Sequence, residues 1–458
     1  MIFEIHAAKP IPGKGPRIAK FYYDNMTSEL KNSEGAHIID PMSKKEIEWT
    51  TALITDPKNP LGKNSTNIQD IKIQMGLSCN YGCEYCSQRF VPHAENGNPK
   101  AVVKFMKNLD LWLKNVPRKF QFWGGEPLVY WKTLKPLATA LREKFPGVKF
   151  GMVTNGSLLT PEINEFLDTM KFSIGMSHDG PGQIVRGPDP FDNPVQAANI
   201  RDLWKRLGKD RMSINAMVHR ENMDRAAIQK FFADFLGTND FSIGEGGFID
   251  TYDAGGAANA INGKAEQLGF RRLTMEQTRE SLTMNFLITK QRIKEWIDAI
   301  SSHRPASTLM QKCNMDRPDT MAVDLNGNVL TCHNTSAVAI APNGKSHRIG
   351  HVSKMEDIKL TTSTHWSLRK NCPKCPMLQA CKGACMYLED DLWDKSCDNS
   401  YNDHLPYFAV AFELITGGYV PYRINASHLP EERQDIWGSL NDQSIVPKTR
   451  TVETKLAV

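Results

Sequence analysis

Residues 70–86, DIKIQMGLSCNYGCEYC, decide the fold and carry the first chemical motif of the chain. The run 70–77 is rich in apolar and β-branched residues and predicts a strand that ends just before the cysteines. Three cysteines then follow with CxxxCxxC spacing, Cys79, Cys83 and Cys86. Three thiolates are one ligand short of a complete four-ligand metal site. This spacing raises the question of what occupies the fourth position.

The same strand pattern recurs along the next part of the chain. Five further runs read as strands, at residues 119–123, 148–154, 172–177, 212–218 and 241–249. Amphipathic stretches separate them, at residues 102–115, 131–145, 195–208 and 225–237. Strand–helix alternation at this spacing predicts a parallel sheet and an α/β fold, here a partial (β/α)6 TIM-like barrel. Sites in such barrels form at the carboxyl ends of the strands, where the cysteine loop lies.

Four regions follow from these patterns. Residues 1–68 read as an irregular N-terminal extension with a cluster of prolines and glycines, and 69–302 as the barrel, closed by a long helical pattern at about 275–302. Residues 303–400 are loop-rich, hold the seven other cysteines and contain a predicted hairpin around Asn326 and Gly327. Residues 401–458 read as a C-terminal tail, aromatic at first and then polar.

Bulk composition excludes several classes of protein. The 458 residues are 40% hydrophobic and carry a net charge of only +5, which does not indicate nucleic acid binding. No apolar run approaches the roughly 18 residues that cross a bilayer, and the N-terminus lacks the pattern of a signal peptide. We therefore expect a cytoplasmic protein without a membrane partner. Ten cysteines in a reducing compartment are then more typical of metal ligands than of disulfides.

The three-cysteine motif admits more than one interpretation. Half of a zinc site, or a redox pair of Cys83 and Cys86, would also fit the spacing. Thiolates also bind iron–sulfur clusters, and three of them can leave one iron of a cubane open. The next strand ends in Trp123-Gly124-Gly125-Glu126-Pro127, where the glycines allow close approach of the backbone and Glu126 can accept from an ammonium group. Together the two loops favour a cluster with an open iron.

CxxxCxxC followed by GGEP after the second strand resembles the radical S-adenosylmethionine (SAM) superfamily. The resemblance implies that the three cysteines hold a [4Fe–4S] cluster whose open iron chelates the amino and carboxylate groups of SAM. It also implies that Gly124, Gly125 and Glu126 hold the methionine end and that Tyr85 lies near the adenine. The reduced cluster of that family cleaves SAM to a 5′-deoxyadenosyl radical, which abstracts a substrate hydrogen.

Further strand ends fit the same resemblance. Asn155 ends the third strand, and Ser177-His178-Asp179-Gly180-Pro181 after the fourth resembles the SIDGP motif of the family. The SAM contacts implied there are Asn155, Ser177, Arg186 and Asn215. Arg186 comes about three residues earlier than is usual for the family's arginine. For Asn215, a place in the plain barrel core is the alternative.

The other seven cysteines resemble the SPASM domain, which carries auxiliary [4Fe–4S] clusters in peptide-modifying radical SAM enzymes of the sulfatase-maturase type. The match runs over about 85 residues, with thirteen residues between Cys313 and Gly327 and a later CxxC–x5–C–x3–C run. It implies one fully ligated cluster, held by Cys372, Cys375, Cys381 and Cys397. It gives the other cluster Cys313, Cys332 and Cys385, with a fourth ligand that the sequence does not supply as cysteine. Three clusters would use all ten cysteines.

The resemblance implies modification of a peptide or protein side chain by crosslinking, epimerisation or oxidation, with a flavodoxin- or ferredoxin-type reductant. A nucleotide, a modified nucleic-acid base or a small metabolite is the alternative substrate, and a non-catalytic iron–sulfur electron carrier is a remote one. Glu245, Asp250 and Tyr252 after the sixth strand are the candidate base or radical partner, with solvated loop residues as the alternative. Residues 1–68 do not show the pattern of a leader-peptide domain, which weakens a leader-dependent mechanism.

Overall fold

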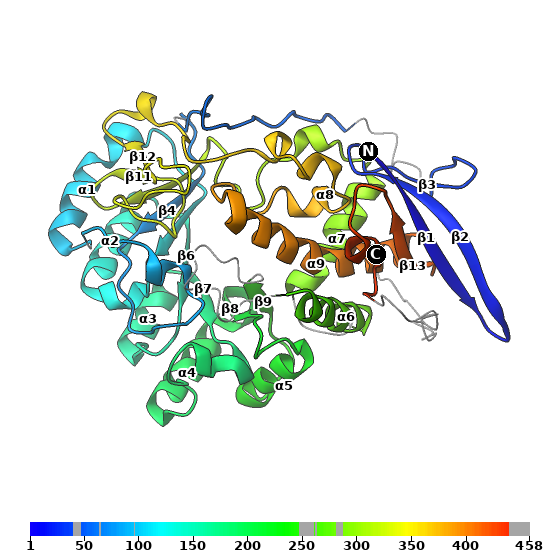
Figure 1. Ribbon diagram of the computed structural model, residues 1–458. Coiled ribbons are helices and arrows are strands. Elements are labelled where there is room, and N and C mark those ends of the chain that lie inside the picture. The colour runs from blue at the N-terminus through cyan, green and yellow to red at the C-terminus, as the bar shows by residue number, and fades with distance from the viewer. Residues whose placement is uncertain are drawn as a thin grey trace.

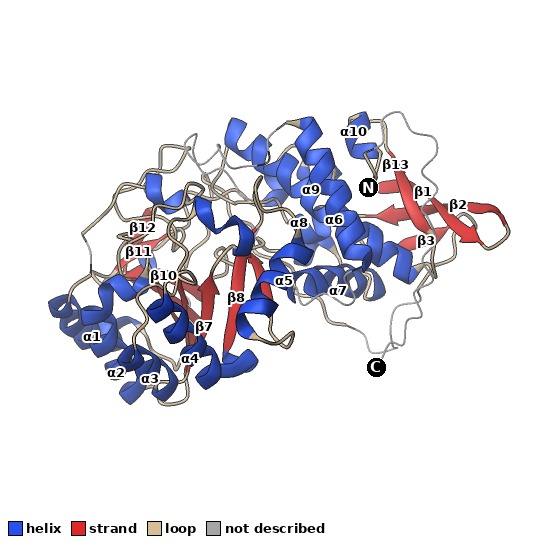
Figure 2. Cartoon of the chain, turned by 90° about the horizontal axis from the view of Figure 1, so that it is seen from below, coloured by secondary structure: helices blue, strands red, loops and turns tan. Residues whose placement is uncertain are grey.

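The computed structural model describes residues 1–39, 47–63, 66–95, 97–246, 261, 263–280 and 287–438 (Figure 1). Two sheets organise this part of the chain, a nine-stranded sheet with the strand order β12-β11-β10-β4-β5-β6-β7-β8-β9 and a four-stranded sheet with the order β13-β1-β2-β3. Figure 2 shows the first sheet and its helices at one end of the molecule and the second sheet at the other.

Six neighbouring parallel strands form one side of the large sheet, up to its edge. They are β4 (Asp70–Gln74), β5 (Lys119–Trp123), β6 (Lys149–Thr154), β7 (Phe172–Ser177), β8 (Met212–Met217) and β9 (Ile243–Gly246). Each lies within a predicted run, and β5 and β7 have the predicted bounds. The α/β class and the partial barrel are therefore confirmed.

Helices cover the outer face of this sheet (Figure 2). They are α1 (Pro99–Trp112), α2 (Trp131–Lys144), α3 (Pro161–Thr169), α4 (Pro194–Arg211) and α5 (Arg225–Leu236). Between the helices and the sheet lies an apolar core that includes four phenylalanines with edge-to-face or tilted rings, Phe120, Phe122, Phe150 and Phe172. Only α3 has no counterpart among the predicted helices, because its nine residues give a short amphipathic pattern. The core fixes the strand ends, and therefore the site, in one arrangement.

The hairpin predicted around Gly327 is confirmed, and it also extends the barrel sheet. Strands β10 (Thr320–Asp324), β11 (Asn328–Leu330) and β12 (Arg348–His351) form an antiparallel run, and β10 pairs in parallel with β4. Gly327 has a φ of 88°, which a turn with left-handed backbone requires. This pairing places the start of the second cysteine region beside the strand that carries the first.

The expectation that residues 1–68 are irregular is wrong for residues 2–32. Strands β1 (Ile2–Ile11), β2 (Lys14–Asp24) and β3 (Leu30–Asn32) form an antiparallel sheet, and the glycine at position 13 belongs to the β1–β2 turn. The strand pattern is visible in the alternating burial of Phe3, Ile5 and Ala7. The cluster of glycines and prolines therefore marks a turn rather than an irregular segment.

The C-terminal region adds a strand to the same sheet. The predicted boundary at residue 400 falls within a helix. Helix α9 (Asp390–Ile415) runs through that boundary, and β13 (Val420–Asn425) pairs with β1 (Figure 1). Phe408 and Phe412 of α9 pack their rings against Tyr23 and Phe21 of β2. The two ends of the described chain thus form one unit.

The remaining helices link these parts. They are α6 (Lys264–Glu280), α7 (Leu287–Ser301), α8 (Leu378–Cys381) and α10 (Glu431–Gln434). The long helical pattern expected at about 275–302 covers the end of α6 and the whole of α7, and residues 281–286 lie outside the described ranges. Among the described residues, we find no helix with the length and apolar character needed to cross a bilayer.

Candidate active site at the carboxyl ends of the barrel strands

The loop after β4 lies at the carboxyl end of the parallel strands. Cys79, Cys83 and Cys86 all line one cavity of about 260 Å³. Burial raises the pKa of the Cys83 thiol to about 12, with the Arg186 guanidinium acting in the opposite direction. A thiol with such a pKa stays protonated at neutral pH unless a metal displaces its proton. Three cysteines that line one pocket are therefore suited to a metal centre.

Two glycines let the end of β5 pack against this loop. A Cβ atom at Gly125 would lie 2.4 Å from the carbonyl oxygens of Leu77 and Ser78, and one at Gly124 would lie 2.7 Å from that of Gly76. The backbone amide of Gly125 donates to the carbonyl of Gly76 over 3.1 Å. Packing against the cysteine loop therefore explains why both positions of the GGEP motif are glycine, even without a bound ligand.

Glu126 is buried with 2% exposure, and its carboxylate lines the cavity. One oxygen accepts from the Thr154 hydroxyl at 2.7 Å and the Leu128 amide at 3.0 Å. The other accepts from the Asn155 amide at 2.7 Å. Burial raises the pKa of Glu126 above its usual value, although these donors oppose the rise. Since a carboxylate offers about four acceptor positions, one remains on the second oxygen for an incoming cation.

Asn155 ties the end of β6 to the cysteine loop. Its side-chain amide donates to the Asn80 carbonyl oxygen at 2.9 Å, and its own oxygen accepts from the Ser157 hydroxyl at 2.6 Å. Asn80 in turn donates to that hydroxyl at 2.8 Å. Asn155 lines the cavity as expected, and these bonds orient the loop between the first two cysteines.

Tyr85 and Arg186 also line the cavity, and both contact each other and the buried carboxylate of Asp179. The Tyr85 hydroxyl donates to Asp179 at 2.6 Å and accepts from Arg186 at 2.8 Å. Asp179 further accepts from the Met217 amide at 2.9 Å, and the His219 ring lies 3.6 Å from it. Although burial alone would raise the pKa of Asp179, the bond with His219 and the charge of Arg186 hold it below its usual value. A fixed anion thus positions the tyrosine and the arginine.

The sequence analysis missed Asp179 as a site residue. It belongs to the quoted motif after β7, and the signal was a polar run directly at a strand end. Its partner His219 had no local signal, because the contact joins the ends of β7 and β8.

Two other predicted SAM contacts differ in their placement. Ser177 at the end of β7 lines the cavity. The Asn215 side chain instead lies between β7 and β9, where its atoms would meet a Cβ at Gly175 within 2.4 Å or at Gly244 within 2.7 Å. Asn215 is not among the residues that line the cavity. Its position therefore has a packing explanation across three neighbouring strands.

The predicted base Glu245 is engaged in a buried ion pair. Its two carboxylate oxygens accept from Arg225 at 2.6 and 2.9 Å, and both side chains are almost fully buried. Burial alone would raise the pKa of Glu245, but the charge of Arg225 holds this pKa below its usual value. A carboxylate held ionised by a bidentate partner is suited to structure more than to proton transfer. Asp250 and Tyr252 lie outside the described residues.

Four of the other cysteines share one small cavity, which is lined by Cys372, Cys375, Cys381 and Cys397. Trp393, Tyr401 and Arg433 are among the other residues of its wall. Burial raises the pKa of Cys372 and Cys375 well above that of a free thiol, and the neighbouring sulfurs add to the rise. The four residues are those that the sequence grouped as one ligand set.

The remaining three cysteines lie in the same region of the fold. Cys332 and Cys385 pack against one apolar cluster under the loop-rich region. Burial raises the pKa of Cys332 to about 11, and the charge of an ionised Cys313 adds to the rise. The positive charges of Lys63 and Lys72 act on Cys313 in the opposite direction to its burial. Two lysines beside these thiols favour an anionic group there.

His333 is a further residue that the sequence analysis missed. It follows Cys332 directly, and its ring centroid lies 4.2 Å from that of Trp123 at the end of β5. Its Nδ1 lies 3.2 Å from the Lys72 ammonium, and burial lowers its pKa well below the usual value. Its position directly after Cys332, a predicted cluster ligand, was the sequence feature that could have indicated it. His333 thus joins the second cysteine region to the barrel face.

These residues fit an iron–sulfur cluster with bound SAM. Three thiols and a buried carboxylate with acceptor capacity line one cavity, and Nε of Arg186 is buried without a partner among the described residues. That orphaned donor indicates a polar ligand in the cavity.

Comparison with known proteins agrees with the site. Residues 73–232 match the family model described as the radical SAM superfamily. Residues 73–232 therefore form a radical SAM domain, and membership of this superfamily implies binding of a [4Fe–4S] cluster and SAM. The prediction of this class is confirmed.

Particular relatives extend the similarity. The cysteine-type anaerobic sulfatase-maturating enzyme of Clostridium perfringens is 23% identical over 375 residues, which cover 74% of this chain and 94% of that enzyme. The radical SAM cyclopropyl synthase TigE of Paramaledivibacter caminithermalis is 26% identical over 177 residues, 34% of this chain. This chain spans between 31% and 51% of the length of TigE and three further curated relatives.

A solved structure shares the fold. Native anSMEcpe with bound AdoMet superposes with a TM-score of 0.55 and 18% sequence identity, covering 76% of this chain and all of that one. The SPASM-type arrangement of a partial barrel followed by a cysteine-rich region is therefore confirmed at the level of the fold.

Proposed function

We propose that this protein is a radical SAM enzyme that modifies a side chain of a peptide or protein. The carrying observation is that three cysteines, the Glu126 carboxylate and the Arg186 guanidinium line one cavity at the strand ends. When bound and reduced, the cluster supplies an electron to SAM, which breaks a carbon–sulfur bond and gives a 5′-deoxyadenosyl radical able to abstract hydrogen.

The role of the protein side chains is to bind SAM and to orient it. Glu126 has one acceptor position for the ammonium group of SAM, and its other bonds fix that position. Tyr85 and Arg186 also line the cavity and are held by Asp179, and a ring and a cation suit the nucleoside and the carboxylate of SAM. Ser177 adds a hydroxyl from β7.

The two other cysteine sets are proposed as auxiliary cluster sites. The cavity lined by Cys372, Cys375, Cys381 and Cys397 supports a fully ligated cluster. The set of Cys313, Cys332 and Cys385 supports a second one that lacks a fourth cysteine. An electron removed from a substrate radical could leave through these groups, and a flavodoxin- or ferredoxin-type protein would serve as the external reductant.

A peptide substrate is supported by the relatives. The C. perfringens enzyme that matches 74% of this chain matures sulfatases, as its name states. Solved structures of anSMEcpe also contain AdoMet together with a peptide, and their fold matches this chain with a TM-score of 0.54. These similarities favour a peptide over a nucleotide or a small metabolite.

Deuterium transfer tests this proposal. The full-length protein, loaded with iron and sulfide under anaerobic conditions, is given SAM, dithionite and peptides encoded beside its gene, deuterated at their side chains. Deuterium in 5′-deoxyadenosine and a matching change in peptide mass support the proposal. Deuterium transfer from nucleotides or small metabolites, with none from any peptide, contradicts it.

A further inference from the structure

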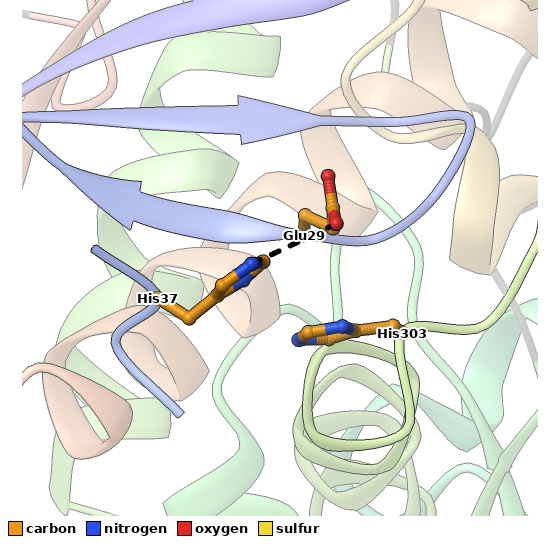
Figure 3. Close-up of side chains that lie close together, drawn as sticks. All are labelled: Glu29, His37 and His303. Carbon is orange, nitrogen blue, oxygen red and sulfur yellow. Dashed lines mark ion pairs between the residues drawn. The ribbon is translucent and has the colours of Figure 1, made fainter. Parts of the chain in front are cut away.

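A cluster of two histidines and a glutamate contains none of the residues of the three cysteine sets. Ligand atoms of Glu29, His37 and His303 all lie within 4.8 Å of one another (Figure 3). Nε2 of His37 is 3.9 Å from Oε1 of Glu29, and the two imidazole rings stack with centroids 4.8 Å apart. No sequence motif joins these residues, because more than 260 positions separate His37 from His303.

Two ring nitrogens of this cluster lack a hydrogen-bond partner among the described residues. Nδ1 of His37 and Nε2 of His303 are shielded from solvent, and within the described ranges no hydrogen-bond partner reaches either atom. An unpaired buried imidazole nitrogen costs free energy, which a metal ion or a donor would recover. The observation is independent of the closeness of the three side chains.

The backbone holds the three residues in place. The Ser28 hydroxyl donates to the Arg304 carbonyl at 2.8 Å, and the Ala306 amide donates to the Met26 carbonyl at 2.7 Å. These bonds join the segment before β3 to the segment after α7. Ser28 and His303 both have left-handed backbone, with φ of 59° and 47°. Strained backbone that is fixed by neighbours is typical of built sites.

The glutamate has one oxygen available. Its Oε2 accepts from the Lys31 ammonium at 3.1 Å, so Oε1 is the atom that faces His37. All three residues are half-buried, which leaves room for a water molecule as a further ligand. The Lys31 charge opposes a cation, and the carboxylate that it pairs with offsets it.

We propose that Glu29, His37 and His303 form a binding site for a divalent transition metal, zinc in the first place. Two imidazoles and one carboxylate with a water molecule are a donor set that zinc accepts in tetrahedral geometry. Such geometry would bring the ligand atoms to about 3.3 Å from one another, given bonds of about 2.0–2.1 Å to the metal. Side-chain rotation within the cluster supplies that change. The metal joins the N-terminal sheet to the end of α7, which leads to Cys313.

Zinc content and zinc ligation test the site in the cluster-loaded full-length protein. Equilibrium dialysis against micromolar zinc, followed by measurement of zinc and iron per chain, should give about one zinc in the wild type. His37→Ala and the milder Glu29→Gln should lose that zinc or bind it at least about tenfold more weakly, at unchanged iron. Unchanged iron reports that each variant is folded and loaded.

His6→Ala is the matched control. His6 lies in the same sheet, 2.6 Å from the Glu4 carboxylate, and belongs to no described three-ligand cluster. This variant should keep its zinc. X-ray absorption at the zinc edge should show imidazole nitrogen and oxygen and no sulfur. Equal zinc in the wild type and His37→Ala, no zinc in the wild type, or sulfur ligation would each overturn the proposal.

Discussion

Nη2 of Arg433 lies 3.7 Å from Sγ of Cys397, one of the four cysteines that share a cavity. The same guanidinium pairs with Asp398, which orients it toward the sulfur. A positive charge and a hydrogen-bond donor beside a cluster ligand stabilise the reduced, more negative state of a cluster.

Replacing Arg433 should therefore lower the reduction potential of the cluster at this site. Arg433→Gln is expected to shift it on the order of 50 mV to more negative values, since 59 mV corresponds to ~1.4 kcal/mol for one electron. A redox titration followed by electron paramagnetic resonance measures the shift. Arg433→Lys keeps the charge and should retain most of the potential, whereas an unshifted Arg433→Gln would show that the arginine does not act on a cluster.

Glu126→Gln should weaken SAM binding while leaving the cysteines intact. The new amide group would place a donor against either the Asn155 or the Thr154 donor, and it removes the charge that an ammonium group meets. Charge-assisted bonds of this kind contribute ~1.5–3 kcal/mol, so the Kd for SAM should rise at least about tenfold. Equilibrium dialysis with labelled SAM measures it. Glu162→Gln, on exposed α3, is the control, and equal affinity in both variants would remove Glu126 from the SAM site.

Iron content tests the assignment of the cysteines to three clusters. The loaded wild type should contain about 12 irons per chain, and Cys375→Ala with Cys381→Ala should remove about four of them. Replacing Cys79, Cys83 and Cys86 by alanine should remove a different set of about four. A wild-type content near four irons would contradict the auxiliary sites.

Stability at mildly acidic pH should depend on His347. Burial lowers the pKa of His347 to about 4, from 6.5 in the unfolded chain, and its ring packs edge-on against Tyr387. As the pH falls through this window, the unfolded chain gains a proton that the folded chain does not, so stability is present above pH 6.5 and declines below it.

His347→Phe removes this proton and should flatten the decline. The effect is about 1 kcal/mol at pH 5.5, seen as a smaller drop in Tm between pH 7.5 and 5.5 than in the wild type. His428→Phe, at an exposed position, should not alter the drop. The same drop in His347→Phe as in the wild type would mean that His347 is accessible to protons in the fold.

The sequence predicts those parts of the site whose residues lie close together in the chain or at the ends of neighbouring strands. The loop with Cys79 and the turn with Glu126 follow β4 and β5, which pair in parallel, so their closeness follows from the strand order. The set of Cys372, Cys375, Cys381 and Cys397 could be grouped from its resemblance to the SPASM domain, and the fold brings its members to one cavity.

Contacts between distant segments could not be predicted. The pairing of β1 with β13 joins residues about 420 positions apart. The composition of a strand does not indicate which other strand it pairs with. The bidentate bond of Arg225 to Glu245 likewise depends on how α5 packs against the last barrel strand. A glutamate at a strand end reads as a candidate base until its partner is known.

Reductive cleavage of SAM is the measurement that tests the central claim most directly. The cluster-loaded wild type, given SAM and dithionite without oxygen, should form 5′-deoxyadenosine, and the protein with Cys79, Cys83 and Cys86 replaced by alanine should form none while it retains its other iron. The absence of 5′-deoxyadenosine from the loaded wild type, or its formation by the triple variant, would contradict the account.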